Sequence, residues 1–437
     1  MERLRWITVR FGIALCFYAC LYTSLNVLLS RRVESQKSRI EREGHPIVAG
    51  ELRGENIPVE EDAGPAFRAL CEIWEGRGNR WTGSGFDALD LKDGVLVKTR
   101  VSGGGSDPLT ALGAEEIAEL RRQLSEHEIL SRLLEEIRRR PRCGTKLAFK
   151  EGPALPLPHL SPAKSLVRYC GVKASLAAID SDYTRSADHL GESLALARCV
   201  AGDRFLLISH LVATALERQS EIHLVSLLES FDFDEPSLAR LQAEMEKLPD
   251  LREGWAEALI GERAIFGSIF ASRLSGEQYV SNPLRRRVHG MARLFLLADY
   301  DAYLSSFPSV FEPQRLLEKK SGEQLEFPAY VTLTPRLLPA WNPTMMNTAK
   351  TLLIRRLTRF AIELRRHRAR TGSYPATLDE LVCPSGFPAP VNPFDEKPFV
   401  YERKGQGFRL TVASRKAWWP SSKSEENLEQ GTINLSR

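Results

Sequence analysis

Apolar residues recur with a helical period along most of the chain. Between residues 165 and 179 they return every three or four positions, which predicts a helix with one buried face. Related patterns predict further helices over residues 184–200, 204–228, 234–248, 251–274 and 284–304. Asp180, Ser181 and Asp182 form a polar turn, and Asp234 or Ser237 is expected to cap the fourth helix. Short links predict antiparallel helical hairpins over residues 162–306.

The longest apolar run lies near the N-terminus, at residues 6–30, and its single charge is Arg10. As a helix it would reach about 37 Å, which exceeds the ~30 Å hydrocarbon core of a bilayer. A cleavable signal peptide has a shorter apolar region and ends in small residues, whereas this run ends at Arg31 and Arg32. We therefore expect an uncleaved transmembrane anchor over 1–32, with the lipid bilayer contacted through residues 6–30.

Basic residues lie on both sides of this run and are more numerous after it, which favours a cytoplasmic body. The layout also resembles the signal anchors of exported bacterial proteins. That resemblance implies a single-pass protein of the cell (inner) membrane with an extracytoplasmic body, and we give it more weight.

The segment 33–161 is predicted to be more irregular. We expect a charged helical stalk over 33–43, an acidic linker over 44–65, a short amphipathic helix over 66–75 and a charged helix over 114–140, bent near Ser125. The glycine-rich stretch 76–107 lacks phosphate-binding spacing and is interpreted as a flexible surface loop. Basic residues at 138–142 complement a helix C-terminus.

A second type of module is predicted near the C-terminus. Prolines make residues 307–343 irregular, and an amphipathic helix follows over 348–370. The arginines of this helix are interpreted as solvated charges rather than as a site for nucleic acid or anionic lipid. Alternating residues predict a β-hairpin over 399–402 and 408–413. Residues 421–437 are polar and expected to be disordered.

Composition and motifs supply little chemistry. The 60 basic and 56 acidic residues nearly balance, so no nucleic-acid partner is expected. The seven cysteines show no zinc-type spacing; Cys170 and Cys199 could meet on neighbouring helices, although two separate buried thiols are favoured. There is no H-E-x-x-H or G-x-S-x-G motif. We therefore predict no catalytic, cofactor-binding or metal-binding residues, and no cofactor.

Two resemblances concern the helical part. Ser181-Asp182-Tyr183, with small residues at Ala174, Ser186 and Ser193, resembles one tetratricopeptide-type hairpin. Residues 58–66, 139–143 and 157–160 together resemble uncharacterised membrane-anchored proteins of planctomycete-type bacteria, a likeness that implies no known activity. His159 belongs to the last of these segments and is expected to cap the first hairpin.

A third resemblance concerns residues 349–413. The T-G-S-Y-P turn at 371–375, T-L-D-E-L at 377–381 and N-P-F at 392–394 resemble the globular end of type II secretion major pseudopilins. In that family the long helix continues into the N-terminal anchor, which here lies far upstream. The family also binds calcium through an acidic loop that has no counterpart after Ala413, so no calcium is expected.

The sequence thus predicts a mainly α protein with an N-terminal transmembrane helix, a repeat-like helical-hairpin body and a small α+β C-terminal module with a β-hairpin. The predicted domains are 1–32, 33–161, 162–306, 307–347, 348–414 and a disordered tail, 415–437. The leading functional hypothesis is a non-enzymatic, membrane-anchored interaction or scaffold protein that binds a protein partner of unknown identity. The alternatives are a component of an envelope secretion or pilus-like system and an uncharacterised enzyme.

Overall fold

A computed structural model describes most of the chain and confirms the predicted fold class: the protein is mainly helical, with a long apolar N-terminal helix and a small C-terminal antiparallel sheet. The described residues are 2–76, 89–92, 95–98, 110–125, 128–275, 283–307, 327–338, 341–383, 387–393, 396–413 and 432–435.

The helical hairpins form where the apolar period predicts them. Their helices are α5 (Leu160–Ile179), α6 (Tyr183–Ala201), α7 (Leu207–Ser230), α8 (Glu235–Glu246), α9 (Leu251–Ser275) and α10 (Pro283–Ser306). Asp182 caps α6 and Asp234 caps α8, because each carboxylate accepts a hydrogen bond from the backbone N–H three residues later. The Ser186 hydroxyl donates to the Ala174 carbonyl over 2.9 Å, so small residues let α5 and α6 approach closely.

The N-terminal helix α1 (Glu2–Arg42) is continuous through the predicted anchor and the predicted stalk. Its apolar part stands clear of the body: Phe11 and Phe17 are 71 % and 70 % exposed. Its last turns instead bury Val33 and Ile40 against α9 and α10. The same helix is therefore exposed along its apolar part and packed against the body at its C-terminal end.

The region between α1 and α5 holds shorter elements. These are η1 (Ala49–Glu51), α2 (Gly64–Gly76), β1 (Leu89–Lys92), β2 (Val95–Lys98), β3 (Thr110–Ala111), α3 (Ala114–Ser125), α4 (Glu128–Arg139) and η4 (Phe149–Ala154). The prediction of a flexible surface loop over 76–107 is wrong for β1 and β2, which pair antiparallel. Leu96 is buried in the main core, and this burial stabilises the short strands. The remainder of that loop lies outside the described residues.

The C-terminal elements are α11 (Thr334–Leu337), α12 (Trp341–Thr371), η7 (Leu378–Glu380), β4 (Phe399–Lys404), β5 (Gly407–Val412) and β6 (Thr432–Leu435). Helix α12 starts seven positions before the predicted 348, because Pro343 falls in its first turn, where the missing N–H costs nothing. The tail was predicted to be disordered, and that is wrong for β6, which pairs with β5 and buries Ile433 and Leu435.

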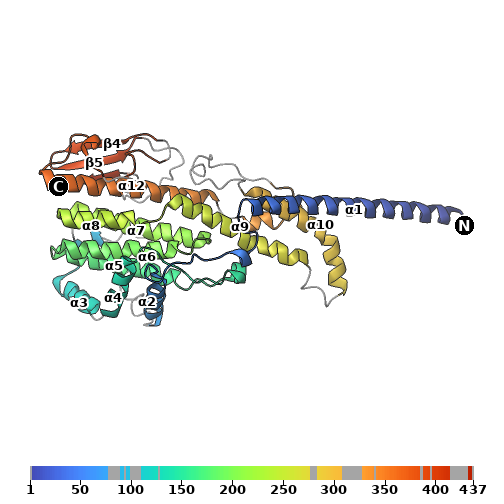
Figure 1. Ribbon diagram of the computed structural model, residues 1–437, viewed down its shortest axis with the longest axis horizontal. Coiled ribbons are helices and arrows are strands. Elements are labelled where there is room, and N and C mark those ends of the chain that lie inside the picture. The colour runs from blue at the N-terminus through green and yellow to red at the C-terminus, as the bar shows by residue number, and fades with distance from the viewer. Residues whose placement is uncertain are drawn as a thin grey trace.

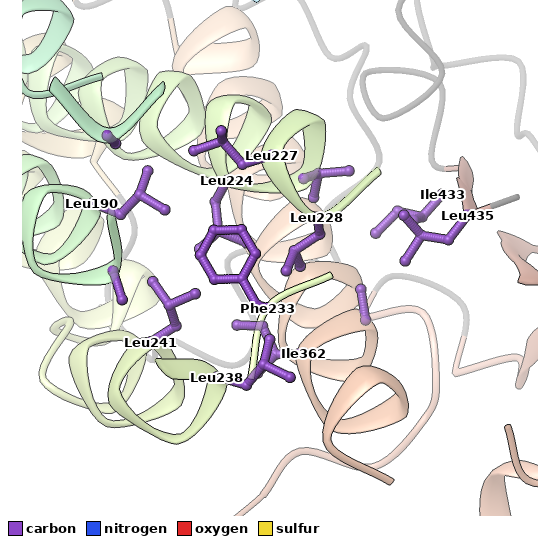
Figure 2. Close-up of a cluster of buried hydrophobic side chains, with 14 of the residues drawn as sticks. Leu190, Leu224, Leu227, Leu228, Phe233, Leu238, Leu241, Ile362, Ile433 and Leu435 are labelled. Carbon is purple, nitrogen blue, oxygen red and sulfur yellow. The ribbon is translucent and has the colours of Figure 1, made fainter. Parts of the chain in front are cut away.

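The body is built in layers (Figure 1). The β4–β5–β6 sheet covers one side of α12; α7 and α8 lie on the other side, followed by α5 and α6 and then by α2 and α4. Helix α1 leaves this body beside α10 and extends away from it as an isolated rod. The largest apolar cluster crosses the layers: in Figure 2, Phe233 lies among Leu224, Leu238 and Leu241, and Ile433 and Leu435 approach from the sheet.

A close approach between α9 and the turn before α7 provides a test of this arrangement. A Cβ atom at Gly261 would lie 2.0 Å from the carbonyl oxygen of Phe205, so the Gly261→Ala substitution must push the two segments apart. We expect a loss of about 2–3 kcal/mol in the free energy of unfolding, measured by urea titration of the detergent-solubilised chain. Gly76→Ala is the control, because that position faces open space. Equal urea midpoints for the two variants would contradict the close approach.

Candidate functional site

A cavity of 320 Å³ lies where four segments meet α7. The segments are the linker around Glu55 and Ile57, Pro141–Thr145, the end of α6 with the turn into α7, and the turn that leads from α8 into α9. Its wall combines small residues with charged ones, and His210 and Glu217 of α7 both contribute to it. Because these positions are far apart in sequence, the sequence offered no motif for this site.

Ion pairs form one rim of the cavity. Glu55 pairs with Arg142 and lies 3.5 Å from Arg204, whose Nε donates to Glu257 over 2.9 Å. The hydrogen bond with Glu257 raises the pKa of Arg204 above its ordinary value. Arg204 also has a φ of 43°, a left-handed conformation that costs about 1 kcal/mol or more outside glycine. The two carboxylates hold this strained turn in place at the cavity edge.

His210 is buried and neutral. Its Nε2 lies 2.8 Å from the Thr348 hydroxyl, which itself donates to the Thr344 carbonyl over 3.0 Å. With its one proton directed to that carbonyl, the hydroxyl accepts from Nε2, which leaves the lone pair on Nδ1. Burial lowers the pKa of His210 to about 4. At neutral pH this wall of the cavity therefore presents an uncharged acceptor nitrogen beside Gly254.

Glu217 forms a two-point ion pair with Arg355 of α12. Its carboxylate oxygens lie 2.5 Å from Nε and 2.7 Å from Nη2, and Arg355 Nη1 donates to the Pro249 carbonyl over 2.7 Å. Glu221 follows one turn later, is completely buried, and has side-chain oxygens without a hydrogen-bond partner among the described residues. Burial raises the pKa of Glu221 well above its usual range, and the nearby Glu217 carboxylate adds to the effect.

These contacts belong to a polar seam between α7 and α12, defined by His210–Thr348, Thr214–Thr351, Glu217–Arg355 and Leu228–Arg365. The sequence separations are 138, 137, 138 and 137 residues, which means that the two helices run parallel in a constant register. The expectation that the α12 arginines are solvated is wrong for Arg355 and Arg365, which are 8 % and 5 % exposed. They contact carboxylates and carbonyls that the sequence of α12 alone does not reveal.

Arg198 and His159 both have structural partners near the cavity. Arg198 Nη2 donates to the carbonyls of Ile137 and Arg140, over 3.2 and 2.7 Å, and so satisfies the C-terminal carbonyls of α4. The sequence had assigned that role to the basic residues 138–142. His159 precedes α5 but makes no side-chain cap; its Nε2 lies 2.8 Å from Asp203 in the α6–α7 turn.

The cysteines near this site are free thiols. Cys71, Cys143, Cys170 and Cys199 all lie in one buried cluster. Burial raises the pKa of the Cys143 thiol well above its usual value, and contact with the Cys199 thiol adds to the effect. Burial likewise raises the pKa of Cys170. Because the thiolate is the reactive form, these cysteines are poor nucleophiles.

The part of the chain that the structure describes contains no group of three or more His, Cys, Asp or Glu residues that could hold a metal ion. What the cavity offers is binding chemistry: an acceptor nitrogen, a buried carboxylate and a rim of paired charges. Comparisons of the chain with protein-family models, with curated proteins and with solved structures find no match.

The ion pair of the polar seam gives a stability prediction. The substitution Arg355→Met leaves Glu217 buried without a counter-ion, so we expect a loss of about 3–5 kcal/mol in the free energy of unfolding. The double variant Glu217→Leu/Arg355→Met removes both charges and should regain most of that loss. Arg370→Met, at a position 42 % exposed, is the control and should cost less than about 1 kcal/mol. A double variant as unstable as the single one would contradict this role of the pair.

His210 gives a pH-dependence prediction. Its folded-state pKa, about 4, lies below the ordinary value of 6.5, so only the unfolded chain takes up this proton between these pH values. The contribution of His210 is complete above pH 6.5 and is lost as the pH falls toward 4, by up to about 3 kcal/mol. The His210→Gln variant should lack this part of the acid sensitivity. Parallel wild-type and variant curves of unfolding free energy across that range would disprove the assignment.

Proposed function

We propose that this chain is a single-pass membrane protein whose helical body binds another protein at the membrane surface and catalyses no reaction. The observation that carries the proposal is the divided environment of α1. Its most apolar 18-residue window has no residue buried by the rest of the protein, and the helix is long and apolar enough to cross a membrane. Exposed apolar surface on this scale is stable in lipid and unfavourable in water.

The attachment of α1 to the body supports the same proposal. Arg32 lies 3.1 Å from Asp301, and Gln36 donates to Asp301 over 2.6 Å. These contacts begin two residues after the apolar run ends at Ser30, so the body would sit directly at the bilayer surface. Stacked helical hairpins of the kind that make up this body commonly present binding surfaces to proteins.

A second candidate function is a small-molecule site in the 320 Å³ cavity, which is the observation that favours it. The groups at its wall suit binding better than catalysis. A histidine with a pKa of about 4 is a weak general base at neutral pH, and the Cys143 thiol stays protonated. We therefore rank catalysis in this cavity below the binding of a small molecule.

The secretion or pilus-like alternative rests on the C-terminal module. Helix α12 is buried against α7 and α8, so deleting residues 349–437 would remove part of the core and disturb folding rather than secretion alone. Substitutions at the exposed positions Val400 and Glu402 of β4 are the appropriate test. Unchanged secretion in both variants would count against this alternative.

The cysteines of α1 provide the test of the main proposal. Cys16 and Cys20 are exposed on the apolar part of the helix, so a charged, membrane-impermeant maleimide reaches them in water but not inside a bilayer. In isolated membranes we expect neither to be labelled until the protein is denatured. The four buried cysteines are protected by the fold, and half-buried Cys383 is replaced by serine to remove the remaining background.

The matched control is Ser35→Cys, at an exposed position of α1 beyond the apolar run. The introduced thiol should react in isolated membranes. In intact cells its labelling also reports the orientation: reaction before lysis places the body outside the cytoplasm, as expected from the sequence, and reaction only after lysis places it inside. If Cys16 and Cys20 react as fast as the thiol at position 35, α1 does not cross a membrane.

A further inference from the structure

Helices α1 and α10 run in the same direction where they pack. Arg32 contacts Asp301, and Gln36 reaches both Asp301 and, over 2.8 Å, Ser305, so positions increase together along the two helices. Leu29, nearer the anchor, packs against the apolar cluster that contains Leu297 of α10. The first half of α10 therefore points toward the apolar part of α1.

This geometry fixes the level of α10 relative to the apolar run. Asp301 is contacted by both Arg32 and Gln36, which lie two and six residues beyond Ser30, or about 3 and 9 Å along α1. The part of α10 that precedes Asp301 must then lie at or past the end of the apolar run. Figure 1 shows this part of α10 diverging from α1, to one side of the rod. If α1 spans a bilayer, the start of α10 lies at the headgroup layer.

The residues of this half of α10 suit that location. The sequence from 283 to 298 contains Arg285, Arg286, Arg287 and Arg293, and its first acidic residue comes only at Asp299. The apolar residues Leu284, Val288, Met291 and Leu294 recur every three or four positions among these arginines. Phe295 is 58 % exposed, although the neighbouring Leu297 is buried. A basic helix with apolar positions and an exposed aromatic ring is typical of helices that lie in the membrane interface.

We propose that the first half of α10, residues 283–296, binds the bilayer surface through anionic phospholipid headgroups, as a second membrane contact beside α1. This inference rests on the proposed membrane anchoring of α1. Lipid is the favoured occupant for two reasons. The segment lies beside the end of the apolar run of α1, and it carries four positive charges with no acidic residue among them. Arg293 Nη1 donates to the Leu274 carbonyl over 3.1 Å, so the segment is also fastened to the end of α9.

The test uses the full-length chain in nanodiscs of phosphatidylcholine, with or without phosphatidylglycerol. Hydrogen–deuterium exchange is followed in peptides that cover residues 283–296. We expect the exchange to be about tenfold slower in the discs that contain phosphatidylglycerol. The triple variant Arg285→Gln/Arg286→Gln/Arg287→Gln should lose this difference between the two discs.

A matched control is Arg121→Gln/Arg122→Gln/Arg132→Gln, at positions 46 %, 61 % and 71 % exposed on α3 and α4. This control should keep the wild-type difference. Exchange that is independent of lipid in the wild-type chain, or slowing that persists in the α10 variant, would overturn the inference and leave the anchor intact. A chain that does not elute with the discs at all would instead overturn the proposed function.

Discussion

The buried ion pair between Glu217 and Arg355 is the interaction on which the arrangement of the body depends. It joins α7 to α12, two helices far apart in sequence that lie parallel in a constant register. A shift by one turn would leave both charges unpaired in the core, at a cost of several kcal/mol, so the pair selects one register. Since β5 and β6 pack on α12, that register also places the C-terminal sheet.

Features that depend on a local pattern of residues could be predicted from the sequence. Features that depend on partners far away in the sequence could not. The helices of the hairpins and the caps at Asp182 and Asp234 follow from spacing and from the chemistry of single residues. Arg355 and Arg365 look like any surface arginine of an amphipathic helix, because their partners lie more than a hundred residues away. Strand β6 escaped prediction because four residues are too few to show an alternation within a polar tail.

The cavity could not be predicted from the sequence for a related reason. Five segments supply its wall, and none of them carries a recognisable motif. The low pKa of His210 follows from its burial, and its Nε2 bonds to Thr348, on a helix that begins more than a hundred residues later. The sequence can indicate that a histidine is present, but its tautomer and its low pKa are properties of the folded surroundings.

The continuity of α1 has a mechanical consequence. A helix of 41 residues is about 60 Å long, and no break separates its apolar part from the turns that pack on α10. Transmembrane helices adjust their tilt to the thickness of the surrounding lipid. If α1 spans a bilayer as proposed, it has no hinge to absorb that adjustment, so a change in bilayer thickness would tilt the whole body together with the helix.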